Sequence, residues 1–162
     1  MRHTPPMTDS AAQMLDALNG EWRGSGTVET PAVAPVDFVE TIRFSRRSET
    51  SLDYWQRAED ADAKLLHSEA GIWRLGSEGR LELTIALPGS VEVAEGEVAD
   101  GSLETTSTSV GRAATSTRFV GAIRRYRLDG DVLDYDVDLA STNFPMSFHL
   151  RATLRRVTRA DR

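Results

Sequence analysis

From Glu21 onward the chain repeats one pattern, in which short runs of alternating apolar and polar residues are separated by Gly, Pro, Ser or Asp. Alternation with a period of two is typical of strands that bury one face, and the turn residues predict tight connections between them. The pair Asp129-Gly130 is the strongest hairpin signal, because this dipeptide readily forms a two-residue turn. About ten such strands in succession predict an antiparallel meander.

A meander of this many strands in a small domain favours closure into an up-and-down β-barrel, because closure removes the exposed edges. Such a barrel has more interior than a few side chains fill, so we expect a ligand cavity like that of lipocalins and fatty-acid-binding proteins. Ahead of the strands, Met14, Leu15 and Leu18 have helical spacing, which predicts a short helix that begins at Asp9 or Ser10 and stops before the strands. The predicted fold class is all-β with a short N-terminal helix.

The chain contains 162 residues, a length that predicts one domain large enough to enclose a cavity. Residues 1–9 include two adjacent prolines and show no periodicity, so we expect a disordered tail there. A single barrel domain is expected to span residues 10–158, followed by a C-terminal tail at residues 159–162.

Composition narrows the classes of function. The absence of cysteine excludes disulfides, thiolate metal sites and thiol nucleophiles. With 25 acidic and 19 basic residues the net charge is −6, which argues against nucleic acid or an anionic membrane as a partner. Neither a signal peptide nor an apolar run of membrane-spanning length is visible, so we expect a cytoplasmic protein.

The chain has three histidines, and only His67 and His149 lie within the predicted barrel. We interpret His67 as a structural residue that is hydrogen-bonded to Glu69 or to the backbone. In the run "FHLRATLRR", simple alternation puts Phe148 and Leu150 on the inner face and turns His149 outward, unless a bulge intervenes or the strand faces a wide cavity mouth. On the residues alone, a lone histidine is more often structural than a metal ligand.

The run "GEWRGSG" also allows a structural interpretation. Trp22 is expected to be a core aromatic at the closed end of the barrel, and Gly24 and Gly26 to mark close backbone contacts. No "GxSxG" nucleophile motif is present. Alternating acids in the run from Asp134 to Asp138 are expected to form a solvated outer face.

Several segments together resemble, in order and without large gaps, the nitrobindin family, over about residues 18–156. These segments are "LNGEWRGSG", "LLHSEAGIWRL", "LTIALPGSVEVAEGEV", "YRLDGDVLDYDVDL" and "FPMSFHLRATLRR". The family's GxWxGxG signature corresponds to Gly20, Trp22, Gly24 and Gly26, and its closing HLxAxL motif to His149, Leu150, Ala152 and Leu154.

The resemblance implies a ten-stranded barrel that holds one ferric haem b per subunit, with His149 as the proximal iron ligand and the catalytic residue. Nitrobindins bind nitric oxide reversibly and isomerise peroxynitrite to nitrate. The resemblance therefore implies a haem-dependent peroxynitrite isomerase whose partners are haem, peroxynitrite and nitric oxide. The sequence leaves open whether the protein forms a homodimer.

Two departures from the family pattern fall at expected haem contacts. Where the family usually carries "YPTI", this chain reads "TPAV", so Ala32 and Val33 replace the threonine and the isoleucine. A lysine common in the family falls at Thr117, beside Arg118. Arg118 offers a guanidinium for a haem propionate, because this pairing with carboxylates is strong. We expect cofactor contacts at all four positions.

An alternative is that the same barrel binds a ligand but catalyses no reaction. In it the protein is a non-catalytic carrier of a fatty acid or another apolar ligand, and His149 is a polar group at the cavity mouth. A third alternative is a barrel that binds a partner and holds no ligand.

Overall fold

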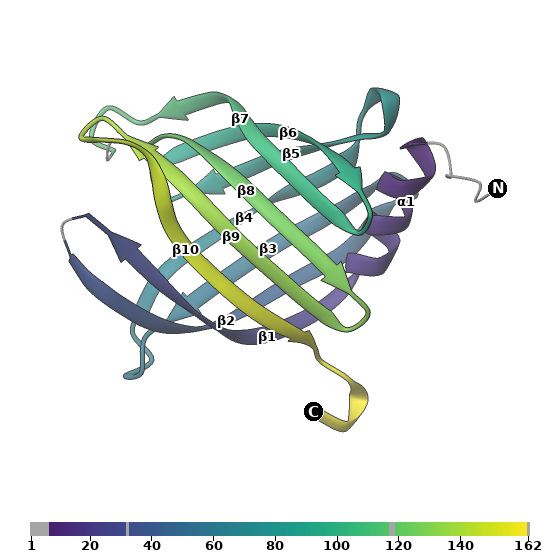
Figure 1. Ribbon diagram of the computed structural model, residues 1–162, viewed down its shortest axis with the longest axis horizontal. Coiled ribbons are helices and arrows are strands. Elements are labelled where there is room, and N and C mark those ends of the chain that lie inside the picture. Colours follow the sequence, from purple (N-terminus) through teal and green to yellow (C-terminus); the bar gives the residue numbers. More distant parts are fainter. Residues whose placement is uncertain (1–6, 32, 117–118, 162) are drawn as a thin grey trace.

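The structure, a computed structural model, describes residues 7–31, 33–116 and 119–161, and it is a closed antiparallel barrel with one α-helix (Figure 1). The strands follow one another around the barrel in sequence order, and β1 closes it by pairing with β10. The predicted fold class is confirmed. The elements are α1 (Met7–Leu18), β1 (Gly20–Thr30), β2 (Val33–Ser48), β3 (Ser51–Glu59), β4 (Leu65–Leu75), β5 (Arg80–Leu87), β6 (Ser90–Ala99), β7 (Ser102–Arg112), β8 (Phe119–Asp129), β9 (Val132–Ser141) and β10 (Phe144–Arg156), with short 3₁₀ helices at Ser77–Gly79 and Arg159–Asp161.

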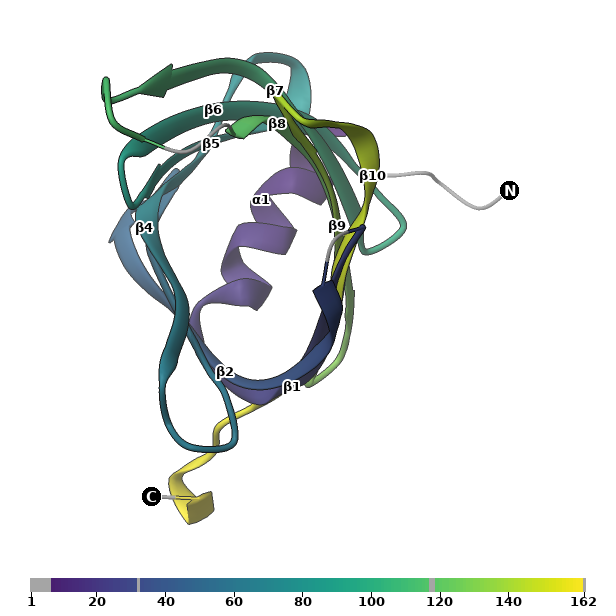
Figure 2. The same ribbon diagram turned by 90° about the vertical axis from the view of Figure 1, so that its left-hand side faces the viewer.

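The helix α1 closes one end of the barrel, and Figure 2 shows it through the opposite, open end. Its apolar side chains Met14, Leu15 and Leu18 are buried, as their helical spacing predicts. The helix begins at Met7, ahead of the expected Asp9 or Ser10. The domain boundaries at residues 10 and 158 stay a prediction. No helix in the described ranges is long and apolar enough to cross a membrane.

The glycine-tryptophan run lies at the closed end, on β1. Trp22 is fully buried, and its indole N–H donates a hydrogen bond of 2.8 Å to the carbonyl of Leu18 at the end of α1. A Cβ atom at Gly24 would lie 2.0 Å from the carbonyl oxygen of Thr153 on β10. Because no side chain fits this gap, glycine lets the two strands that close the barrel approach each other. This agrees with the structural interpretation of the run.

The interior has three layers, which follow from the order of inward residues along each strand. On β4, for example, Trp73 packs near α1, Glu69 follows in the middle and His67 lies toward the open end. The layer near α1 is an apolar core with an aromatic cluster, in which Trp73 meets Phe44 and Tyr126 edge-on at centroid distances of 5.0 and 4.9 Å. The middle layer is polar, and a cavity occupies the open half.

Candidate functional site

A β-bulge on β10 decides the direction of His149. Phe148 pairs with Asp138 of β9, and Leu150 pairs with Val137, so His149 is an extra residue between two rungs of the ladder. The bulge puts both His149 and Leu150 on the cavity wall. Phe148 leaves the inner face, where simple alternation had placed it, and its ring lies under the guanidinium of Arg151 at 5.1 Å.

The cavity into which His149 points has a volume of about 310 Å³, at the lower end of the range of ligand pockets. Leu66, on its wall, is 41% exposed, so the cavity communicates with solvent at the open end of the barrel. Most of the wall is apolar, and the side chains that form it are Val28, Val36, Phe38, Ala58, Leu66, Leu87, Phe119, Ala122, Val137, Leu139 and Leu150.

Opposing influences act on the pKa of the His149 imidazole, and burial is the largest of them. Partial burial lowers its pKa below the ordinary value, because the charged form loses hydration, whereas a hydrogen bond to the backbone of Glu29 acts in the opposite direction. The lowered pKa favours the neutral ring, which has a lone pair available to a metal. The backbone contact occupies one ring nitrogen, and the described side chains offer no hydrogen bond to the other. Such an arrangement is usual in metal-binding histidines.

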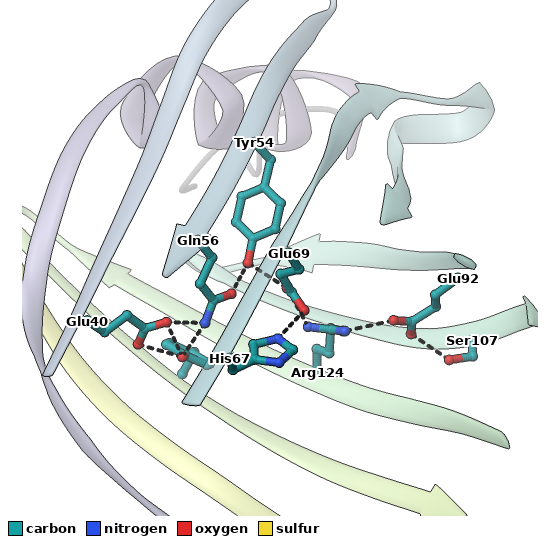
Figure 3. A network of polar contacts seen from close by, with 9 residues as sticks. Glu40, Tyr54, Gln56, His67, Glu69, Glu92, Ser107 and Arg124 are labelled. Carbon is teal, nitrogen blue, oxygen red and sulfur yellow. Dashed lines mark hydrogen bonds and ion pairs between the residues drawn. The ribbon is translucent and has the colours of Figure 1, made fainter. Parts of the chain in front are cut away.

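The floor of the cavity is a buried ion-pair cluster (Figure 3). The guanidinium of Arg124 donates from one nitrogen to Glu69 at 3.0 Å and from the other to Glu92 at 2.7 Å. All three side chains are buried. Arg124, Glu69 and Glu92 come from β8, β4 and β6, so barrel closure brings together charges that are far apart in the sequence.

A third buried carboxyl group, Glu40 on β2, lies beside this cluster. The hydroxyl of Tyr135 donates to both of its oxygens, at 2.7 and 2.6 Å, and the amide of Gln56 also donates to it. The hydroxyl of Tyr54 contacts the carbonyl oxygen of Gln56 and, at 2.7 Å, Glu69. Figure 3 shows that these contacts form one continuous network from Glu40 to Arg124.

The two carboxyl groups Glu40 and Glu69 have opposite pKa shifts. Burial alone raises the pKa of both. At Glu69 the charges of Arg124 and the hydrogen bond from His67 outweigh burial, and the pKa falls to about 2. At Glu40 the hydrogen bonds from Tyr135 and Gln56 do not offset burial and the nearby charge of Glu69, so the pKa rises to about 7.

His67 lies on β4 and lines the same cavity as His149. Its Nε2 atom contacts Glu69 at 2.9 Å, so the expected bond to Glu69 is present. The barrel order places β4 four strands from β10 in one direction and six in the other, so the two histidines lie on nearly opposite walls. The cavity therefore has two imidazoles, where the sequence interpretation counted one.

The remaining predicted site residues are the four expected cofactor contacts and the signature residues of β1. Ala32, Thr117 and Arg118 lie outside the described residues, and Val33 is the first residue of β2. The signature residues Gly20, Trp22, Gly24 and Gly26 are absent from the cavity wall among the described residues; they belong to β1, with Trp22 in the closed half.

Acids on β9 form a solvated outer face, as expected, and are paired there. Arg125 contacts Asp136 and Asp138, each at 3.0 Å, and Thr153 donates to Asp134. A broad open hollow of about 1180 Å³ is lined partly by these residues. Arg125 on its wall pairs with Glu104 and Asp136, and no histidine is on this wall among the described residues, so we place the candidate site in the inner cavity.

Residues 11–156 match the family model described as "THAP4-like, heme-binding beta-barrel domain". The chain belongs to this haem-binding barrel family. The match includes every strand of the barrel, and the resemblance to nitrobindins is confirmed.

Individual relatives agree with the family match. The chain is 36% identical over 148 residues to a Mycobacterium avium protein named peroxynitrite isomerase 2, which covers 88% of this chain and 92% of that protein. It is also 36% identical over 148 residues to the peroxynitrite isomerase of Nocardia farcinica, with 88% of each chain covered.

Solved structures show the same barrel. The crystal structure of Rv2717c from M. tuberculosis has a TM-score of 0.83 at 32% identity and covers 97% of this chain and 100% of that chain. The S-type phycobiliprotein lyase CPES from Guillardia theta has a TM-score of 0.67 at 11% identity, covering 95% and 99% of the two chains. The second likeness shows the fold alone.

The polar layer was missed by sequence reasoning, although one signal for it exists. In "SVEVAEGEV" the valines suggest the inner face, but Val91 and Val93 are 52% and 37% exposed and Glu92 is fully buried. In the first half of β6 the inner face is thus opposite to the one that Val91 and Val93 suggest, whereas Ala94 and Val98 farther along are buried on that inner face. Pairing with β5 and β7 determines which side of β6 faces the interior. The sequence signal is therefore the alternation of the two neighbouring strands, because residues paired across a sheet point to the same face.

Replacement of Arg124 by methionine is expected to lower the free energy of unfolding by about 3–5 kcal/mol, because it leaves two buried carboxylates without a cation. Arg125 also pairs with acids, but at the surface, so Arg125→Met is expected to cost about 1 kcal/mol or less. Urea unfolding of both variants measures the difference. Equal losses would show that the buried cluster is not specially important for stability.

The combined contribution of Glu40 and Glu69 to the free energy of unfolding is expected to be greatest near pH 4.5, the ordinary pKa of a glutamate. Below that pH the unfolded chain binds more protons at Glu69, so stability is lost as the pH falls toward 2. Above it the folded chain binds more protons at Glu40, so stability declines by roughly 3 kcal/mol at most as the pH rises to about 7.

The variant Glu40→Gln isolates the second effect, since glutamine cannot titrate. Urea unfolding across this pH range is expected to show no decline on the alkaline side in Glu40→Gln. The exposed Glu97, paired with Arg80 at 3.5 Å, provides a control, and Glu97→Gln is expected to keep the decline. A decline of the same size in Glu40→Gln would contradict the assignment.

Proposed function

We propose that this barrel binds one ferric haem b per chain, with His149 as the axial iron ligand, and isomerises peroxynitrite to nitrate. The observation that carries the proposal is the bulge at His149, which turns a partly desolvated imidazole into an apolar cavity. The family match to a heme-binding barrel and the relatives named peroxynitrite isomerase support it.

The residues present fit a haem group. A porphyrin supplies four of the iron's ligands, so the protein needs to provide one axial donor in an apolar enclosure. His149 is such a donor, and the hydrogen bond to the backbone of Glu29 orients its ring. Among the described residues no group of three or more His, Cys, Asp or Glu side chains is suited to hold a bare metal ion.

When bound, the haem supplies a redox-active iron on which peroxynitrite rearranges and to which nitric oxide binds. The chain's own contribution is enclosure and orientation. Apolar side chains such as Phe38, Leu87 and Leu139 would surround the bound group with a poorly hydrated wall and keep the reacting species close together. His149 fixes the group's position. The cytoplasmic location stays a prediction.

A fatty-acid carrier is disfavoured by the charge of the cavity floor. Arg124 is already shared between Glu69 and Glu92, so a carboxylate placed there would be a further negative charge beside buried acids. Carboxylates of any ligand, including haem propionates, are therefore expected to point toward the open end of the barrel.

Titration of the purified protein with hemin is expected to give a sharpened, shifted Soret band in the wild type. His149→Ala is expected to weaken hemin affinity at least tenfold and to alter the band, because the axial bond is lost. The other cavity histidine provides the matched control, and His67→Ala is expected to keep the axial-ligand spectrum. A spectrum indifferent to His149→Ala would refute the ligand assignment.

Stopped-flow mixing of hemin-loaded protein with peroxynitrite is expected to accelerate its decay and to raise the yield of nitrate over nitrite. The hemin-loaded His149→Ala variant, compared at equal haem content, is expected to lose most of this acceleration. Free hemin at the same concentration serves as the baseline. Haem binding without acceleration above this baseline would leave a haem carrier and exclude the isomerase.

A further inference from the structure

The buried charges beneath the cavity do not balance. Within the described ranges, three carboxyl groups are buried there, Glu40, Glu69 and Glu92, and the one buried guanidinium is that of Arg124. Its two terminal nitrogens contact Glu69 and Glu92, at 3.0 and 2.7 Å. Glu40 is 3% exposed, and its described partners are only the hydroxyl of Tyr135 and the amide of Gln56. A buried carboxyl group without a cation is expected to hold its proton more tightly than an exposed one.

Glu40 faces titratable or charged groups from several strands. On β1, the residue paired with Glu40 is Gly24, which has no side chain. The α1 side chains that are buried in the closed end are apolar. The titratable groups that act on Glu40 are Tyr135 from β9 and His67 and Glu69 from β4. The same polar network holds Tyr54 from β3, Arg124 from β8 and Glu92 from β6, which lie farther along it (Figure 3).

Hydrogen-bond counting shows that the amide of Gln56 has two consistent orientations. The hydroxyl of Tyr54 has one hydrogen but contacts two acceptors, Gln56 Oε1 and Glu69. In the first orientation Gln56 donates to ionised Glu40 and accepts from Tyr54. In the second, the amide is turned over, protonated Glu40 donates to Gln56, Gln56 donates to Tyr54, and Tyr54 donates to Glu69. Only the second gives Glu69 a third donor beside Arg124 and His67.

We propose that Glu40 is the proton-storing group of the haem site, and that the amide of Gln56 transmits its protonation state through Tyr54 and Glu69 to His67 in the cavity wall. This inference rests on the proposed function. If an external one-electron reductant such as dithionite were to reduce the bound iron from ferric to ferrous, one negative charge would be added above the floor. One proton from solvent then joins a carboxylate oxygen of Glu40, and no other bond is made or broken.

The first experiment needs no haem. Infrared difference spectra of the protein without haem are expected to show a protonated carboxyl band that disappears with a midpoint near pH 7. The band is expected to be absent in Glu40→Gln and retained in Glu97→Gln. Tyr135→Phe removes a donor to the ionised form and is expected to move the midpoint upward. A band that survives Glu40→Gln, or no band titrating in this range, would overturn the proposal.

The second experiment uses hemin-loaded protein reduced with dithionite in a spectroelectrochemical cell. In the wild type the ferric-to-ferrous equilibrium is expected to shift by up to about tenfold per pH unit around pH 7, equivalent to about 59 mV for one electron. Glu40→Gln is expected to flatten this slope, and Glu97→Gln to keep it. Equal slopes in wild type and Glu40→Gln would refute the coupling.

The infrared titration and the redox titration distinguish a failure of the proposed haem binding from a failure of the proposed proton storage at Glu40. If hemin gives no Soret band, the proposed function fails, and the infrared titration still decides whether Glu40 stores a proton. If hemin binds and the pH dependence of the ferric-to-ferrous equilibrium is the same in the wild type and in Glu40→Gln, haem binding is supported and the coupling to Glu40 is refuted. In addition, Gln56→Met keeps the length of the side chain but removes the amide, and it is expected to reduce the slope while the infrared band remains. An unchanged slope in that variant would show that Gln56 does not transmit the proton's effect.

Discussion

One buried guanidinium shared between two buried carboxylates divides the interior of this barrel. Burying an isolated charge is very costly, so Arg124, Glu69 and Glu92 can be buried only together and in good geometry. They come from β8, β4 and β6, and their pairing therefore constrains how these strands face one another across the barrel. On the side of this ion-pair cluster that faces α1, the interior is a close-packed apolar core. On the side that faces the open end, the interior is the cavity.

The half of the barrel that α1 closes stabilises the fold, so that the other half can contain a cavity. The helix α1 covers one end of the barrel with Leu15 and Leu18, and the aromatic cluster around Trp73 fills the interior behind it. This packing provides the stability that the cavity half gives up by leaving its volume empty. A ligand site at the open end can then have an apolar wall without compromising the fold.

The site itself depends on a local departure from regular structure. One inserted residue on β10 exchanges the faces of Phe148 and His149, and the exchange moves an aromatic ring outward beneath Arg151 and an imidazole inward. A similar barrel at 11% identity shows that this architecture is compatible with very different sequences. The donor that the bulge presents, and the network beneath it, give this barrel its particular site.

The amino-acid sequence alone is enough to identify the fold class, the family and the two histidines from which a ligand could be chosen. Period-two alternation, the turn residues and the GxWxGxG run are local signals that survive without coordinates. Three features become visible only in three dimensions: His149 points inward, Glu92 is buried while Val91 is exposed, and Glu40 meets no cation among the described side chains. These outcomes depend on register between strands and on partners up to 95 residues apart, such as Tyr135 and Glu40, because a side chain's face and the charge it meets are set by its neighbours in space.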